Sequence, residues 1–204
     1  MNSNATVMPG APMIAHPLLR HRDGHHARVT FEELFFDLVY VFAVTQLSHE
    51  LLHNLTAFGV VEALILWFAV WLGWQYTCWV TNWFDPETPR IRGMLFVTML
   101  IGLIMAASIP QAFSDRGLVF ACAYVAMQLG RTAFITLQLP KDHALASNYR
   151  RMLGWLSISA VFWIAGAFMH HDLLVMSCLT TAVVLIVGFW EARLMRARRM
   201  EFNA

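Results

Sequence analysis

Two charged residues lie inside long apolar stretches of this sequence, where an unpaired charge is energetically unfavourable. Asp37 lies near the start of the first apolar stretch and Arg131 near the end of the fourth. An ionisable side chain in a membrane span costs about 2.5–3.5 kcal/mol on insertion scales, so each needs a partner or a function. Because an arginine can extend several ångströms toward the membrane surface along its stem, we predict an ion pair between Arg131 and Asp37, with Glu33 close by.

Polar residues line one side of each helix that carries these charges. With the period of an α-helix, Glu33, Asp37, Tyr40 and Ser48 fall on one side of the first helix, and Tyr124, Gln128, Arg131 and Gln138 form a stripe on the fourth. Two such stripes indicate helices that face each other. They either hold a bundle together through hydrogen bonds or line a path for a proton, an ion or a solute.

A further polar group ends the first helix, where His49, Glu50 and His53 are followed by Glu62. Two histidines one helical turn apart, with a glutamate after the first, match the zinc and general-base spacing of metalloproteases. A catalytic zinc also needs a third ligand, for which Glu62 is the nearest candidate. An intramembrane zinc protease would instead take an aspartate ligand from a later span, and no aspartate lies in one. We therefore interpret these residues as polar groups at the membrane interface, where a histidine can relay protons. A zinc hydrolase is the least favoured function, and no catalytic residue, metal or cofactor is predicted.

The composition defines the elements that must position these residues. Of 204 residues, 58% are hydrophobic and 13% charged, and the mean hydropathy is +0.55. Soluble domains carry about twice that share of charge. Six stretches are long enough to cross a hydrocarbon core about 30 Å thick. They cover 34–52, 60–80, 94–113, 118–139, 152–168 and 173–190.

The predicted fold is therefore an all-α, polytopic membrane bundle of six transmembrane helices. A polar tail rich in His and Arg covers 1–30, the transmembrane domain covers 31–192, and a basic tail covers 193–204. When the connections are assigned to alternate sides, twelve of the 14 Lys and Arg fall on one side and Arg116 alone on the other. Because short loops rich in Lys and Arg stay in the cytoplasm, both termini are predicted to be cytoplasmic.

Several function classes are excluded by what the sequence lacks. The net charge of +1 offers no basic surface for a nucleic acid. No phosphate-binding loop and no dinucleotide-binding glycine motif is found in the sequence. Lys141 is the only lysine and lies between spans, which excludes a retinal Schiff base within the membrane. The expected partners are the lipid bilayer, further copies of the chain in a homo-oligomer, and an unidentified small solute or ion.

Five strings of the sequence carry a family resemblance. They are 33–49 (ELFFDLVYVFAVTQLSH), 79–86 (WVTNWFDP), 105–113 (MAASIPQAF), 124–131 (YVAMQLGR) and 163–168 (WIAGAF). In these strings the chain resembles the N-terminal half of the bacterial low temperature requirement protein A family. The resemblance implies a multi-pass protein of the bacterial cytoplasmic (inner) membrane, and it implies no particular molecular activity.

A second resemblance concerns only the first helix. Arg28, Phe36-Asp37 and the run Ala43-Val44-Thr45 are similar to the Phe-Ser-Asp signature of the endolysosomal potassium channel family and its six-helix bacterial relatives, with Phe36 in the place of the serine. Our hypothesis is a non-enzymatic membrane protein that moves a small solute or ion between the first and fourth helices. The alternatives are a structural or regulatory membrane protein, in which the polar residues only join helices, and a six-helix cation channel.

Overall fold

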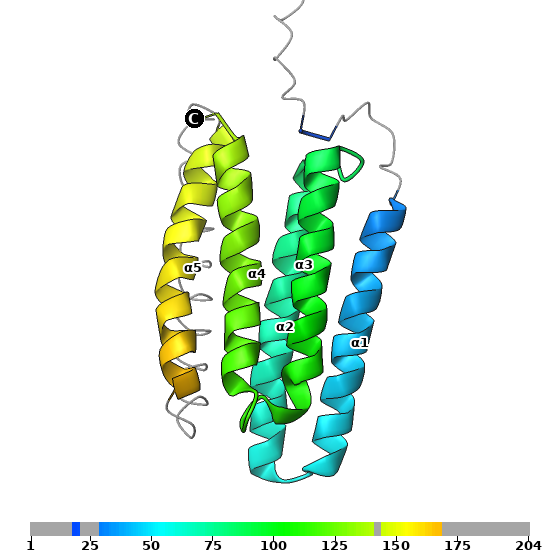
Figure 1. Ribbon diagram of the computed structural model, residues 1–204, viewed down its shortest axis with the longest axis vertical. Coiled ribbons are helices and arrows are strands. Elements are labelled where there is room, and N and C mark those ends of the chain that lie inside the picture. The colour runs from blue at the N-terminus through cyan, green and yellow to red at the C-terminus, as the bar shows by residue number, and fades with distance from the viewer. Residues whose placement is uncertain (1–17, 21–28, 141–143, 169–204) are drawn as a thin grey trace, which may run out of the picture.

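The computed structural model describes residues 18–20, 29–140 and 144–168, and these form an all-helical, up-and-down bundle (Figure 1). Its elements are α1 (Phe31–His53), α2 (Ala57–Trp83), α3 (Pro89–Ser108), the 3-10 turn η1 (Ile109–Gln111), α4 (Gly117–Gln138) and α5 (Ala144–Phe168). No strand occurs in the described part, apart from one isolated bridge between Leu19 and Phe84. The all-α prediction is thus confirmed for these residues.

Local sequence signals set where the helices begin. Thr30 and Glu33 form a capping box at the start of α1, because the Thr30 hydroxyl accepts from the Glu33 backbone N–H at 3.3 Å and the Glu33 carboxylate accepts from the Thr30 N–H at 2.9 Å. The Thr56 hydroxyl caps α2 by accepting from Gly59 N at 3.0 Å. Pro89 occupies the first turn of α3, where its missing N–H costs nothing.

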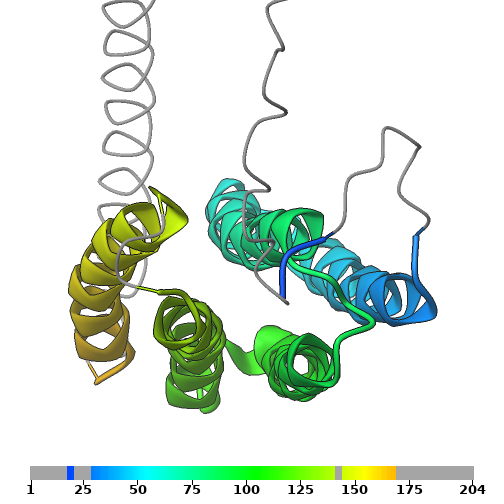
Figure 2. The same cartoon turned by 90° about the horizontal axis from the view of Figure 1, so that it is seen from above.

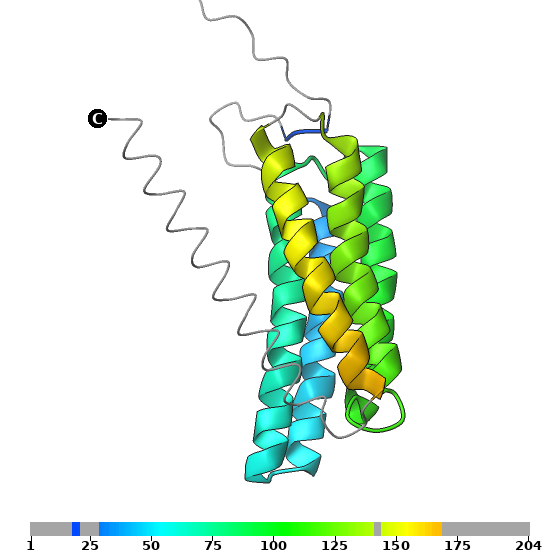
Figure 3. The ribbon, with the colours of Figure 1, turned by 90° about the vertical axis from the view of Figure 1, so that its left-hand side faces the viewer.

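Packing places α2 on one side of a curved row formed by the other helices. α3 packs between α1 and α4, and α5 packs on the far side of α4. α2 contacts both α1 and α4 (Figure 2). The side view shows α1 to α4 running along one long axis, with α5 inclined to them (Figure 3). Consequently α2 lies between the two helices on which the predicted polar stripes stand.

Four of the described helical segments are long and apolar enough to cross a membrane. They are Ala57–Trp83, Pro89–Gln111, Gly117–Gln138 and Leu145–Phe168. α1 is not among them, since its acidic residues and histidines lower its hydropathy. The sixth predicted stretch, 173–190, and both chain ends lie outside the described residues. Six spans and the direction of the termini therefore stay predictions.

All five described helices begin earlier than their apolar stretches, and the difference is largest for α3 and α5. α5 starts at Ala144 rather than 152, and α3 starts at Pro89 rather than 94. In both cases the added turns carry arginines, which extend a helix as readily as an apolar residue does. In α3 one of them, Arg92, pairs through Nε with Glu32 Oε1 at 2.7 Å and joins the starts of α3 and α1. The sequence pattern located the apolar parts and missed these polar first turns.

The tight connection between α1 and α2 yields a first testable prediction. A Cβ atom placed on Gly59 would stand 2.1 Å from the Asn54 carbonyl oxygen and 2.7 Å from Asn54 Cγ. Because the obstructing atom is a backbone carbonyl oxygen, which cannot rotate away as a side chain can, Gly59→Ala is expected to destabilise the protein by about 1–3 kcal/mol, the usual cost of overpacking. Thermal unfolding in detergent micelles would measure it. Gly154→Ala is the matched control, since a Cβ there meets nothing within 4 Å; equal melting temperatures for the two variants would contradict the close approach.

Candidate functional site

Asp37 lies in α1 and is held by a side chain of α2. The indole Nε1–H of Trp74 donates to Asp37 Oδ1 at 2.7 Å, and Asp37 is only half-buried. It lies six positions after Phe31, the first residue of α1, which is about 9 Å along the helix axis. The carboxylate therefore stands within the bundle and is oriented by one neutral donor.

Arg131 lies in α4 and is fully enclosed, with 2% of its surface exposed. Its Nη1 donates to the Gly73 carbonyl oxygen at 3.1 Å and to Thr77 Oγ1 at 2.7 Å, both in α2. Its Nη2 donates to Gln128 Oε1 one turn earlier in α4. The guanidinium also lies 5.6 Å from the centre of the Tyr76 ring, within reach of a cation–π interaction. All of these partners are neutral.

The predicted ion pair between Asp37 and Arg131 is wrong. The ion pairs between described residues are Arg20 with Glu33 and Arg92 with Glu32. The physical reason is the position of α2: Gly73 and Thr77 take the guanidinium, and Trp74, which follows Gly73, takes the carboxylate. Both charged side chains are thus bound to the same stretch of α2 rather than to each other.

Near these charges, α1 and α4 meet at a different pair of residues. Tyr40 OH donates to Met127 Sδ at 3.2 Å, and both residues are buried. The approach is close because α2 has a glycine at this level. A Cβ on Gly73 would stand 2.5 Å from Met127 Cε and 3.0 Å from Tyr40 OH. Gly73 thereby lets α1 and α4 come together beside α2.

The stripe predicted on α4 is continuous over three of its four residues. Gln128 Nε2 donates to Tyr124 OH at 3.2 Å while Gln128 Oε1 accepts from Arg131, so the amide links the phenol to the guanidinium. The Tyr124 ring also packs on Trp163 of α5, with centroids 4.8 Å apart. Gln138 is separate, since its Oε1 accepts from Arg90 Nη1 at 3.1 Å at the end of the bundle.

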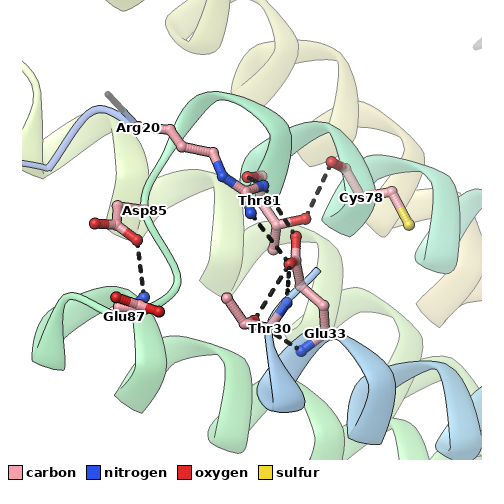
Figure 4. Close-up of polar contacts among 7 residues, drawn as sticks. All are labelled: Arg20, Thr30, Glu33, Cys78, Thr81, Asp85 and Glu87. Atoms are coloured by element: carbon pink, nitrogen blue, oxygen red, sulfur yellow. Dashed lines mark hydrogen bonds and ion pairs between the residues drawn. The ribbon is translucent and has the colours of Figure 1, made fainter. Parts of the chain in front are cut away.

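Glu33 and Ser48 make hydrogen bonds within α1 and do not join the site around Asp37 and Arg131. Besides capping α1, Glu33 pairs with Arg20 Nη1 at 3.3 Å, and the same nitrogen donates to the Thr81 carbonyl at 3.1 Å (Figure 4). Arg20 thus ties the segment before α1 to the end of α2. Ser48 Oγ donates to the Val44 carbonyl at 2.9 Å within α1.

The group at the other end of α1 is remote from these charges. His49, Glu50 and His53 lie in the last turns of α1, and Glu62 lies in the second turn of α2. Among the residues that the structure describes, no three His, Cys, Asp or Glu side chains gather closely enough to hold a metal ion.

Two grooves border the two charged residues. The α1–α2 groove has a volume of about 460 Å³ and is lined by Asp37, Tyr40, Val41, Val44, Thr45, Ser48, Trp67, Val70, Trp71 and Trp74. The α3–α4 groove has a volume of about 480 Å³, and its lining includes Met127, Gly130 and Arg131. Each charged residue thus borders a different groove.

Sequence reasoning missed the residues of α2 that hold the charges. Gly73, Trp74, Tyr76 and Thr77 supply a carbonyl, an indole N–H, a ring face and a hydroxyl to them. The available signal was a glycine and a threonine one helical turn apart in an apolar helix, a spacing that lets another helix approach and hydrogen-bond.

Comparison with known proteins gives one matching family model and one similar curated protein. The family model described as bacterial low temperature requirement A protein (LtrA) matches residues 28–204. An uncharacterized protein of Rhizobium meliloti (strain 1021) is 38% identical over 171 residues, which are 83% of this chain and 42% of that protein. The chain therefore spans less than half the length of this relative. No solved structure matches the chain.

Proposed function

This chain belongs to the bacterial low temperature requirement A family, and from that premise we propose that it moves a small solute or ion across the bacterial cytoplasmic membrane. The family membership and the apolar helices make it a membrane protein. The proposed path runs between the α1–α2 groove and the α3–α4 groove, at the level of Asp37 and Arg131.

One observation carries this proposal: two charged side chains stand among membrane-type helices, and neither has an oppositely charged partner among the described residues. A buried charge that only stabilised the bundle would gain most from a counter-charge, which would offset its desolvation. Charges kept apart inside a membrane protein are by default candidates for a substrate, ion or proton pathway.

The distribution of arginines supports an orientation for this path. Five described arginines lie at the end where α1 begins, namely Arg20, Arg90, Arg92, Arg150 and Arg151, and Arg116 lies at the opposite end. By the positive-inside rule we propose that the first end is cytoplasmic. Asp37 and Arg131 would then belong to the cytoplasmic half of the membrane. Assembly into a homo-oligomer and the absence of enzymatic activity stay predictions.

Flux into proteoliposomes would test the proposal. We expect liposomes containing the full chain to take up at least one of H⁺, K⁺ or an organic ammonium ion faster than empty liposomes. Asp37→Asn, which keeps an acceptor for the Trp74 indole and removes the charge, is expected to lower that flux about tenfold or more, as loss of about 1.4 kcal/mol of interaction does. Folding of each variant would be checked by gel filtration and circular dichroism.

Asp115→Asn is the matched control, because it removes an exposed acidic charge at the opposite end of the bundle. Its flux should equal that of the unaltered chain. Well-folded protein that gives no flux above empty liposomes for any of the three probes would overturn the transport proposal.

A structural role is the second candidate, and the bonding of Arg131 favours it. Its guanidinium joins α4 to α2 through Gly73 and Thr77, which is what a residue that holds helices together would do. Under this alternative, Arg131→Lys would lower stability and leave membrane permeability unchanged. Under the transport proposal, the same variant would also change flux.

A further inference from the structure

We infer that the α1–α2 groove binds a small organic ammonium ion with an apolar body. The inference names a substrate class for the proposed path, and in that sense it rests on the proposed function. It is carried by the charge, the hydrogen bonds and the aromatic walls of the groove, each of which favours a cation over an anion or a neutral solute.

Among the described residues that line this groove, Asp37 alone carries a charged group. Its Oδ1 accepts from the Trp74 indole at 2.7 Å. Its Oδ2 has no hydrogen-bond or ion-pair partner among the described residues, and it is absent from their fully buried unpartnered atoms. One carboxylate oxygen is therefore accessible and free to meet a cation.

The hydroxyl groups of Thr45 and Ser48, which line the groove, already donate hydrogen bonds to backbone carbonyls of α1. Thr45 Oγ1 donates to the Val41 carbonyl and Ser48 Oγ to the Val44 carbonyl, each at 2.9 Å. What these oxygens still offer is acceptor lone pairs. An anion would find repulsion at Asp37 and no donor at either hydroxyl, whereas an ammonium group finds acceptors at all three positions.

Tryptophan side chains form the opposite wall. Trp67 and Trp71 are stacked with centroids 6.2 Å apart and an interplanar angle of 13°. They remain 39% and 37% exposed, so part of each indole is open to a ligand. Indole faces are the strongest cation–π partners among side chains, and aromatic walls beside a carboxylate are a common solution for ammonium ligands. The valines that also line the groove, Val41, Val44 and Val70, suit an apolar body.

Size and depth favour a free small molecule over a lipid head group. The volume of about 460 Å³ falls within the usual range of small-molecule sites. When the predicted start of the apolar stretch at residue 34 is taken as the edge of the hydrocarbon core, Asp37 lies about 4.5 Å inside it. A lipid would have to pull its head group into the hydrocarbon region to reach the carboxylate.

Titration calorimetry with benzylammonium, whose N–H groups can donate to these acceptors, on the full 204-residue chain in detergent micelles, would test the inference. We expect saturable binding that weakens about tenfold or more in Asp37→Asn and in Trp71→Leu, and that Asp37→Glu largely retains. Benzenesulfonate, which has a similar body and the opposite charge, should not bind. Asp115→Asn should bind the probe like the unaltered chain.

The possible results separate this inference from the transport proposal. Binding that depends on Asp37, without flux in proteoliposomes, would support the site and overturn transport. Flux of H⁺ or K⁺ that depends on Asp37, with no binding of the probe, would support transport and overturn the site. Equal binding of probe and benzenesulfonate would also overturn the site, as would binding that Asp37→Asn and Trp71→Leu leave unchanged.

A lipid occupant has its own signature. In nanodiscs of phosphatidylglycerol alone the probe should bind as in micelles, and added phosphatidylethanolamine should leave its affinity unchanged. If phosphatidylethanolamine competes with the probe, the groove binds a lipid head group and the inference of a free ammonium ion is overturned. A dimer that dissociates in Asp37→Asn, together with absence of probe binding, would assign the groove to a second copy of the chain.

Discussion

Replacing Arg131 with glutamine is expected to destabilise the folded protein by about 2–4 kcal/mol, because hydrogen bonds to a charged donor contribute about 1.5–3 kcal/mol each. The Gly73 carbonyl and the Thr77 hydroxyl would lose this partner together. Unfolding in mixed micelles with increasing sodium dodecyl sulfate, followed by circular dichroism, would measure the loss. Arg116→Gln is the control, since this arginine is exposed and reaches only the Ala107 carbonyl at 3.3 Å.

Double-mutant cycles would identify which partners Arg131 has. Combined with Thr77→Val, Arg131→Gln should show a coupling energy of about 1 kcal/mol, as expected for residues in contact. Combined with Asp37→Asn, it should be additive within about 0.5 kcal/mol, because the two charged residues share no hydrogen bond. Strong coupling to Asp37 and none to Thr77 would restore the direct ion pair and contradict the bonding through α2.

Contacts within one helix could be predicted from the sequence, because the α-helix fixes their geometry. Tyr124, Gln128 and Arg131 are spaced by four and three residues, and they do form one hydrogen-bonded chain. The apolar part of each described helix was likewise predicted from its length and composition. The ends were less certain, as the polar first turn of α5 demonstrates.

Contacts between helices could not be predicted in the same way. The stripes on the first and fourth helices suggested that these face each other, and the pattern of those two helices contains nothing about a third. The deciding residue is Gly73, whose missing side chain admits Met127 and Tyr40 while its carbonyl takes Arg131. Whether a glycine in an apolar helix faces lipid or another helix depends on packing, which one sequence does not encode in any local pattern.

Gly73 therefore carries the second large effect. Gly73→Ala is expected to cost about 2 kcal/mol, within the range for overpacking a close-packed interior. The new Cβ would stand 2.5 Å from Met127 Cε and 3.0 Å from Tyr40 OH, so Met127 must move within a core where it is 1% exposed. Displacing α1 or α4 would also disturb the hydrogen bonds of Arg131. The loss would be measured by the same unfolding experiment.

Gly93 offers the matched comparison within the same bundle. It lies in α3, lines the α3–α4 groove, and a Cβ there meets nothing within 4 Å. Gly93→Ala should consequently be neutral or stabilise by about 0.5–1 kcal/mol, the usual gain when a helical glycine becomes alanine. Because Met127→Ala removes the obstructing Sδ and Cε atoms, its cycle with Gly73→Ala should show a favourable coupling of about 1 kcal/mol. If Gly73→Ala were as benign as Gly93→Ala, α1, α2 and α4 could not meet at Gly73, and the arrangement that separates Asp37 from Arg131 would be wrong.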